Sequence, residues 1–277
     1  MNTVTITPVS ENTAPTGMGL TGEHGLSFHI VNNGETILFD TGQGLVLENN
    51  MKVLGKNLSE IDKVVLSHGH YDHTGGLGAL AEAGKFELFS HPASFLPKLA
   101  SLDGINFLDI GCPFSKNYLE NKSVTLNLSD KPLKISDNIK TTGEIELRNE
   151  FELTEPHFYS QTNEEKIHDT IPDDMGIIIE TKKGIVLILG CTHRGIINTL
   201  EHVSEITGSK KFHTVIGGLH LGGADEKKMD LIIEQLKNFE IENLVTGHCT
   251  GSYAQTRLES AESVNHQFIK IGLPYTF

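Results

Sequence analysis

Four side chains that can bind a metal ion fall within six consecutive residues of this chain. They follow the pattern His-x-His-x-Asp-His and are His68, His70, Asp72 and His73. The apolar run Val64-Val65-Leu66 precedes them and predicts a buried strand. The pair Gly75-Gly76 follows them and leads into a helix expected over 76–83. The cluster therefore lies on a loop at the carboxyl end of a strand, and a solvated His-rich loop does not account for the full pattern in this setting.

The spacing of the cluster favours two ions over one, because its four side chains cannot all reach a single ion. On an extended segment His68 and His70 point to the same side, while Asp72 and His73 follow after the chain has turned. The simplest arrangement is two adjacent divalent ions, one held by each pair. Nitrogen and carboxylate ligands suit zinc, with manganese and iron as alternatives.

The composition limits the partners of the chain. Its formal net charge of −14 over 277 residues argues against a nucleic-acid backbone or an anionic membrane as partner. A small phosphorylated ligand stays compatible, because metal ions can dominate the field inside a site. We see no signal-peptide pattern and no apolar run near the roughly 20 residues that span a bilayer, so we expect a cytoplasmic protein. Three widely spaced cysteines are no disulfide framework.

Strand and helix signals repeat one plan in two halves of the chain. A hairpin over 26–40 and another over 175–190 are each followed by a helix and then by a strand that ends in histidine. Two such halves predict an α/β fold, a four-layer αβ/βα sandwich of two mixed β-sheets with helices outside. We expect a single domain over 1–277, in which the least regular stretch, 101–170, is a substrate-facing insertion.

The remaining elements follow from apolar periodicity and from turn residues. The other expected strands are 3–9, 63–67, 86–90, 213–217 and 243–246. The other expected helices are 43–57, one from 196 that stops at Gly208, 225–239 and 252–262.

Polar or metal-capable groups recur at the ends of these strands, where α/β folds place their chemistry. They are Asp40, the 68–73 cluster, Cys191 with His193, His220, and His248. His91 ends another strand and could contact substrate or shuttle a proton, although a structural role is equally compatible. Thr250 stands at an expected helix start, where exposed amides could hold an anion but where it would also be a good N-cap.

These motifs resemble those of the metallo-β-lactamase-fold hydrolase superfamily, whose architecture is the αβ/βα sandwich. Within it they are most similar to prokaryotic metal-dependent hydrolases labelled 7,8-dihydropterin-6-yl-methyl-4-(β-D-ribofuranosyl)aminobenzene 5′-phosphate synthase. The segments that carry this similarity are Asp40-Thr41-Gly42, Gly190-Cys191-Thr192-His193, Gly218-Leu219-His220-Leu221 and Gly247-His248-Cys249-Thr250-Gly251. The resemblance implies a phosphorylated, pterin-type substrate.

The resemblance also implies further metal ligands. His248 follows its strand as the last ligand of the superfamily follows its late strand. Position 191 is usually an aspartate that touches both metals, and here it is Cys191, whose thiolate is a good zinc ligand. A buried cysteine can also simply pack, which leaves His193 as the alternative ligand.

The chain departs from the superfamily just before the hairpin over 175–190. Another histidine is common there, whereas this chain has Ile171-Pro172-Asp173-Asp174. The first metal therefore has fewer protein ligands, or it uses Asp173 or Asp174.

Together the residues and the resemblance predict a metal-dependent hydrolase of a small phosphorylated or phosphodiester substrate, with a pterin-related compound as one option. A metal-bound hydroxide would be the nucleophile. Asp72 would hold the second metal and accept a hydrogen bond from the hydroxide, and His220 is the other expected catalytic residue. Asp40 would orient a histidine N–H. The alternative is a non-hydrolytic diiron redox or sensor protein on the same fold.

Overall fold

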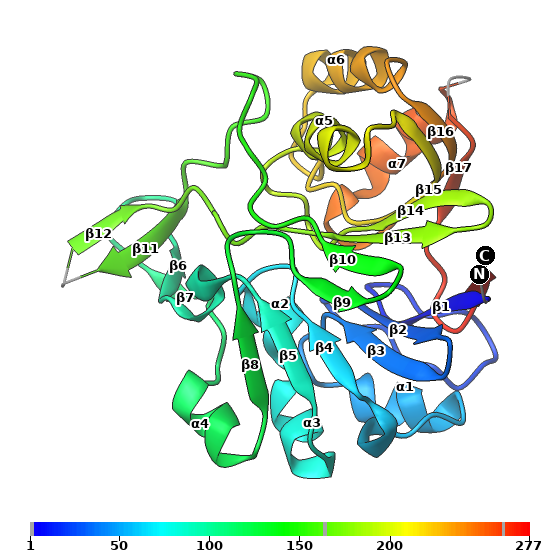
Figure 1. The fold of residues 1–277 in the computed structure, drawn as a ribbon. Coiled ribbons are helices and arrows are strands. Elements are labelled where there is room, and N and C mark those ends of the chain that lie inside the picture. The colour runs from blue at the N-terminus through cyan, green and yellow to red at the C-terminus, as the bar shows by residue number, and fades with distance from the viewer. Residues whose placement is uncertain (1–2, 163–164, 262–263) are drawn as a thin grey trace. The chain divides into compact units, whose positions relative to one another are not determined.

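The computed structural model describes residues 3–162, 165–261 and 264–277. The described chain comprises two compact units. The first unit holds the residues up to Asp130, together with Glu155–Asp173 and Lys270–Phe277. The second unit holds Lys131–Thr154 and Asp174–Ile269. Each unit contains its own mixed sheet, as Figure 1 shows.

The main sheet of the first unit begins with antiparallel strands and continues with parallel ones. In spatial order its strands are β18 (Tyr275–Thr276), β1 (Val4–Ser10), β2 (Ser27–Asn32), β3 (Glu35–Phe39), β4 (Lys63–Val65), β5 (Glu87–Ser90) and β8 (Thr125–Leu128). Strands β3, β4, β5 and β8 pair in parallel. Their carboxyl ends therefore lie at one edge, which gathers Asp40, the 68–73 loop and His91.

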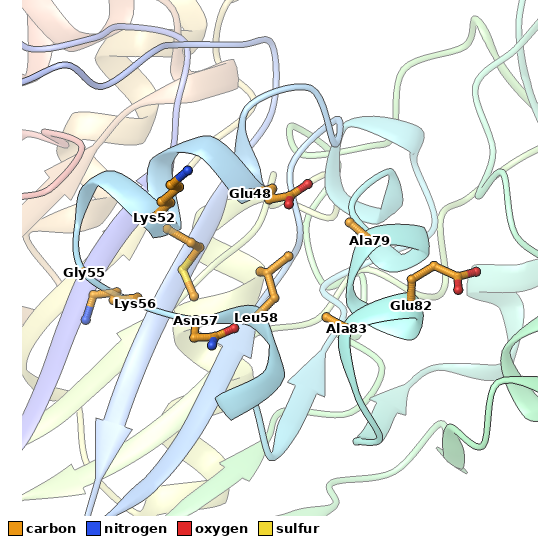
Figure 2. A pocket seen from close by; sticks show the side chains of 10 residues that line it. Glu48, Lys52, Gly55, Lys56, Asn57, Leu58, Ala79, Glu82 and Ala83 are labelled. Atoms are coloured by element: carbon orange, nitrogen blue, oxygen red, sulfur yellow. The ribbon is translucent and has the colours of Figure 1, made fainter.

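Helices α1 (Leu47–Val53) and α3 (Leu77–Ala83) cover one face of this sheet. Met51 and Leu80 belong to the same buried cluster as Val64 of β4. Residues of α1, of the 3-10 helix η1 (Leu58–Glu60) and of α3 line an open pocket of about 690 Å³, shown in Figure 2. Its lining contains no histidine and no cysteine, so this pocket lacks the expected metal ligands.

A second, antiparallel sheet in the first unit comes from the stretch expected to be an insertion and the residues just before it. Its strands, in spatial order, are β12 (Glu165–His168), β11 (Phe158–Thr162), β6 (Lys98–Ala100) and β7 (Leu108–Asp109). The stretch 101–170 also supplies helix α4 (Lys116–Asn121) and strand β8 to the first unit. It therefore contributes to all three sheets of the described chain, with residues 163 and 164 outside the description.

The sheet of the second unit repeats the plan of the first. In spatial order its strands are β17 (His266–Phe268), β16 (Glu240–Thr246), β15 (Lys211–Gly217), β14 (Gly184–Ile188), β13 (Ile177–Thr181), β10 (Ile139–Thr141) and β9 (Lys134–Ser136). The β13–β14 hairpin is followed by the parallel strands β15 and β16, as the β2–β3 hairpin is followed by β4 and β5. The repeat expected from the sequence is present.

Three helices pack their apolar residues on this second sheet. They are α5 (Ile196–Thr207), α6 (Glu226–Leu236) and α7 (Ser252–Glu259). Leu200, Met229 and Leu258, one from each helix, belong to a single buried cluster with Leu187 and Leu244 of the sheet. The expected fold class, mixed α/β with sheets flanked by helices, is confirmed.

Several expected elements are shorter in the structure. The helix expected over 43–57 covers only Leu47–Val53, because the Glu23 carboxylate accepts hydrogen bonds from the amides of Gln43 and Leu45 and holds them outside a helix. The strand expected over 63–67 ends at Val65. Helix α7 ends at Glu259, and the expected end at 262 lies outside the described residues. Among the described helices, none is long and apolar enough to cross a membrane.

His29 on β2 makes the stability of the first unit depend on pH. Its side chain is buried and its Nδ1 atom makes no hydrogen bond to any described residue. Burial, and then the charge of Lys56, lower the pKa of His29 from 6.5 to about 4. Between these two values the unfolded chain binds more protons than the folded chain, so this contribution to stability falls as the pH falls.

We expect the His29→Leu variant to lose this dependence. The free energy of unfolding of the parent, relative to the variant, should fall by about 2 kcal/mol between pH 7 and pH 4.5. Urea denaturation of both proteins at the two pH values measures this difference. A gap between parent and variant that stays constant with pH would contradict the assignment to His29.

Candidate metal centre

Asp40 closes the loop that carries the histidine cluster in the first unit. Its Oδ1 atom accepts a hydrogen bond from the Ser67 amide at 2.7 Å. Its Oδ2 atom lies 2.7 Å from the Ser67 hydroxyl and 2.7 Å from Nδ1 of His73. Since Asp40 accepts through that contact, the proton of a neutral His73 sits on Nδ1, and Nε2 keeps the lone pair that a metal needs.

The four side chains of the cluster converge in the structure. His68 Nδ1 lies 2.8 Å from the Ser67 hydroxyl, and His68 Nε2 lies 3.0 Å from His70 Nδ1. The ring centres of His68 and His73 are 4.3 Å apart. After His70 the chain forms the single helical turn α2 (Tyr71–Thr74), which brings Asp72 Oδ2 to 3.7 Å from His73 Nε2. All four side chains are buried.

This donor set fits divalent metal ions. Two ligands at zinc distances of 2.0–2.1 Å around a tetrahedral ion stand about 3.3 Å apart. The atom pairs His68 Nε2–His70 Nδ1 at 3.0 Å and His73 Nε2–Asp72 Oδ2 at 3.7 Å bracket that spacing. Imidazole nitrogen with carboxylate oxygen suits zinc, manganese and iron. One pair of donors for each of two ions is the division expected from the sequence.

His24 is a further histidine at this cluster, and no sequence pattern singled it out. Its Nε2 atom lies 3.2 Å from Asp72 Oδ2, and its side chain is 55% exposed. It stands 48 positions before Asp72 in the chain, in a segment that sequence patterns show only as a loop. A neutral or charged His24 can hydrogen-bond to Asp72 and so help to set the orientation of that carboxylate.

The carboxylates of Asp173 and Asp174 have protein contacts of their own. Asp173 accepts from the Gly69 amide with Oδ2 and from Lys98 Nζ with Oδ1, both at 2.7 Å. Asp174 Oδ2 accepts from the Arg194 amide at 2.8 Å. Both oxygens of Asp173 are engaged in these contacts, so Asp173 is the less suited of the two aspartates to bind the first metal.

Cys191 lies at the centre of the strand-end groups of the second unit. One donor atom each of Cys191, His193 and His220 lie within 4.8 Å of one another, and so do donor atoms of Cys191, His248 and Cys249. The ring centres of His193 and His220 are 4.0 Å apart. Cys191 belongs to both groups, so the geometry of this unit leaves both Cys191 and His193 as candidate ligands.

The backbone is strained at the candidate residues. Thr192, His220 and His248 have φ angles of 63°, 46° and 51° in the second unit, and Asp40 has 56° in the first. A residue with a side chain in this region costs of order 1 kcal/mol or more, and such residues gather at functional sites. Asn33, Ser123 and Ile171 share this conformation elsewhere in the described chain, so the strain adds to the evidence from residue chemistry and does not replace it.

Cys249 ties the loops of the second unit together, a role that the sequence did not reveal. Its Sγ atom accepts from the His220 amide at 3.3 Å and donates to the Cys191 carbonyl at 3.5 Å. Burial raises the pKa of this thiol, but the hydrogen bond to Cys191 and the charges of His248 and His220 lower it further than burial raises it. Gly218 is required beside it, because a Cβ atom there would stand 2.6 Å from Sγ.

Three other side chains support loops and helix starts near the candidate residues. His91 Nδ1 accepts from the Ala93 amide at 3.1 Å and caps the 3-10 helix η2 (Pro92–Phe95). The Thr250 hydroxyl accepts from the Leu219 amide at 3.1 Å and so supports the His220 loop. The Glu152 carboxylate, which no sequence pattern singled out, accepts from the first amides of α5, those of Ile197 and Asn198, at 2.9 Å each.

We expect the Asp40→Asn variant to bind metal about 10- to 100-fold more weakly, because an amide cannot replace a carboxylate that accepts three hydrogen bonds and fixes the His73 tautomer. Competition with a chromophoric chelator measures the affinity. Asp62→Asn is the matched control, since Asp62 accepts a single, exposed hydrogen bond from the Thr36 amide. Equal affinities in both variants would contradict the role given to Asp40.

Comparison with known proteins gives the same fold. A family model described as metallo-beta-lactamase superfamily matches residues 20–248. A relative from Methanocaldococcus jannaschii, named 7,8-dihydropterin-6-methyl-4-(beta-D-ribofuranosyl)-aminobenzene-5'-phosphate synthase, is 34% identical over 243 residues, which are 84% of this chain and 83% of the relative.

Solved structures extend the likeness over the whole chain. Tm1679, described as a metal-dependent hydrolase of the beta-lactamase superfamily, has a TM-score of 0.85 at 25% identity, with 98% of both chains covered. Zn²⁺-bound PqqB from Methylobacterium extorquens has a TM-score of 0.58 at 14% identity, with 98% of this chain and 99% of that chain covered, and shares the fold.

Proposed function

Because the chain belongs to the metallo-β-lactamase superfamily, we propose that it is a hydrolase that uses two divalent metal ions, zinc first among them, on a small phosphorylated substrate. The observation that carries the proposal is the pairing of donors in the first unit. His68 with His70, and Asp72 with His73, form two adjacent donor pairs, and Asp40 fixes the tautomer of His73.

Bound divalent ions would supply Lewis-acid activation of water and of the electrophilic centre of the substrate. The residues of the chain would do the rest. His68 and His70 would hold one ion, and Asp72 and His73 the other. The Asp72 carboxylate would accept a hydrogen bond from the attacking water and so fix its direction, while Asp40 keeps the His73 proton on Nδ1.

In the second unit, His220 is the proposed proton donor to the leaving group. Its ring lies against that of His193, and its amide is held by Cys249. A histidine is suited to this role, because its ordinary pKa lies near neutral pH. Cys191 and His248 are the other two proposed metal ligands of the chain.

For the substrate we propose a phosphomonoester or phosphodiester that carries a pterin-type ring. The basis is the name of the relative that is 34% identical. That name describes a synthase of a phosphate compound in which a dihydropterin is linked to a ribofuranosyl-aminobenzene. The net charge of −14 makes a polyanionic macromolecule a poor partner, whereas a small phosphate ester could be neutralised by the ions.

Metal analysis together with a substrate panel tests this function. The purified protein is loaded with zinc, manganese or iron, its metal content is measured, and it is assayed with phosphomonoester, phosphodiester, carboxylic ester and lactone substrates, including pterin phosphates. We expect two ions per chain and turnover of a phosphate ester that stops on chelation. A coloured diiron protein that cycles with oxygen and hydrolyses nothing would overturn the proposal.

A further inference from the structure

We propose that Lys98 and Asp173 are positioning residues that hold the metal loop at Gly69 and fasten the four-stranded sheet to it. The inference rests on the proposed function, because it assigns a role toward the metal that His68 and His70 would hold. All the residues involved belong to the first unit.

The first step is the set of contacts around Lys98, the first residue of β6. Lys98 is only 1% exposed, and Asp173 is fully buried. Lys98 Nζ donates to Asp173 Oδ1 at 2.7 Å and to Asp169 Oδ2 at 3.0 Å. The other oxygen of Asp173 accepts from the Gly69 amide at 2.7 Å. A continuous chain of charge-assisted bonds therefore runs from β6 to the peptide between His68 and His70.

The second step is that Gly69 is held from another direction as well. A Cβ atom on Gly69 would stand 2.2 Å from the Ser94 carbonyl oxygen, so the backbone of Ser94 lies directly against it. With Ser94 against its α-carbon and Asp173 on its amide, the peptide plane at Gly69 has little freedom. That plane sets the relative directions of the His68 and His70 side chains, whose ring nitrogens must meet at 3.0 Å.

The third step is that stability alone does not explain a buried lysine. Removing an ammonium and its partners from water costs several kcal/mol per ion, and apolar residues of similar size often serve a fold as well or better. One lysine between two carboxylates also leaves a net charge of −1 in the interior. Asp173 is close enough to His70 for their charges to interact. This excess negative charge behind the loop favours the binding of a cation at His68 and His70. Such support matters at this pair, because the segment just before β13 has Asp173 and Asp174 where the resemblance would place a further histidine ligand.

The fourth step connects the four-stranded sheet to the same loop. The Tyr71 amide donates to the Ile110 carbonyl at 2.9 Å, just after β7. The ring centre of Phe158, on β11, lies 5.3 Å from that of His70. Together with the Lys98–Asp173 pair, these contacts fix the loop to the sheet at three places. Removing the pair should therefore loosen the loop without unfolding the unit.

The test is the double variant Lys98→Met/Asp173→Leu, which removes the tie at Gly69 together with the charges of both its members and leaves Asp169 as the remaining buried carboxylate of the group. Its control is Lys63→Met/Glu35→Leu, which removes a pair 2.6 Å apart between β3 and β4, away from Gly69. Each protein is titrated with cobalt(II), and the affinity, stoichiometry and visible absorption spectrum are recorded along with the thermal midpoint.

We expect the Lys98→Met/Asp173→Leu protein to remain folded, to bind the first cobalt ion at least about tenfold more weakly, and to show an altered cobalt spectrum. The control should keep affinity and spectrum. Parental affinity and spectrum in the folded double variant would overturn the proposal. None of these readouts is an activity, so a wrong assignment of hydrolysis would leave this result intact and would appear only in the substrate panel.

Asp173→Asn is the second variant, for the case that the double variant does not fold. It keeps the shape of the side chain and an oxygen for the Gly69 amide, and it loses the negative charge. We expect at least about fivefold weaker cobalt binding, since the charge that favours the cation is gone. Unchanged affinity in folded Asp173→Asn would overturn the electrostatic part of the role, and with it the proposal.

Discussion

The His70→Ala variant is expected to bind one metal ion fewer per chain than the parent and to lose nearly all hydrolytic activity, while the fold survives. His70 follows the end of β4 and lies on the loop, outside the strands and helices that form the core. Its Nδ1 atom stands 3.0 Å from His68 Nε2, the spacing of two ligands on one ion. Without it, the site at His68 would keep a single cluster histidine. The loss of activity should exceed the roughly 10- to 100-fold that removal of an outer hydrogen-bond partner causes.

Elemental analysis of the dialysed protein measures the ion content, and circular dichroism checks the fold. His168→Ala is the matched control, because His168 is an exposed histidine of the same unit, and its Nε2 atom lies 3.1 Å from the backbone carbonyl of Glu155. The control should retain both ions and full activity. Two ions per chain in His70→Ala would show that His70 is not a ligand.

The sequence predicted the parts of this protein that depend on neighbouring residues. The His68–His73 pattern, the glycine pair after it and the hairpin turn at Asn33-Gly34 are all local. The metallo-β-lactamase fold expected from these motifs is confirmed. Asp40 could be singled out because it ends a strand beside the one that leads to His68.

The contacts that support the cluster could not be predicted in the same way. Lys98 and Asp173 are 75 positions apart, and Gly69 and Asp173 are 104 apart. Glu152 reaches the start of α5 from 45 positions before Ile197. No periodicity or turn signal records such pairs. Lys98 and Glu152, taken alone, are typical of ordinary surface charges, and Asp173 was singled out only as a possible metal ligand. The irregular stretch 101–170 was the least legible part because its short strands belong to three different sheets.

The second large effect is expected at position 191, where this chain has cysteine in place of the commoner aspartate of the superfamily. Cys191 is buried, and its Sγ atom is within ligand reach of both the His193–His220 and the His248–Cys249 groups. A thiolate is a soft ligand that favours zinc, whereas a serine hydroxyl is a poor ligand at neutral pH. If Cys191 binds metal, Cys191→Ser should lose one ion per chain.

The Cys191→Asp variant tests whether a carboxylate can replace the thiolate as a metal ligand. A carboxylate restores a charged ligand at this position, so metal content should return, and the preference should shift from zinc toward manganese or iron, which suit oxygen ligands. Cys112→Ser is the control for the loss of a thiol, because the Cys112 thiol donates to the Phe114 carbonyl in the first unit and has no part in the second-unit groups. Its metal content should equal that of the parent.

His193 provides the competing assignment. If His193 is the ligand and Cys191 only packs, Cys191→Ser keeps its full metal content, and His193→Ala loses an ion. We expect the reverse, because Cys191 comes before His193 on the loop that follows β14, as Asp40 begins the loop that follows β3. Measuring the metal content of the two single variants side by side separates the assignments. Full metal retention in Cys191→Ser together with a loss in His193→Ala would assign the ligand to His193. The centre would then lack the soft thiolate ligand that favours zinc.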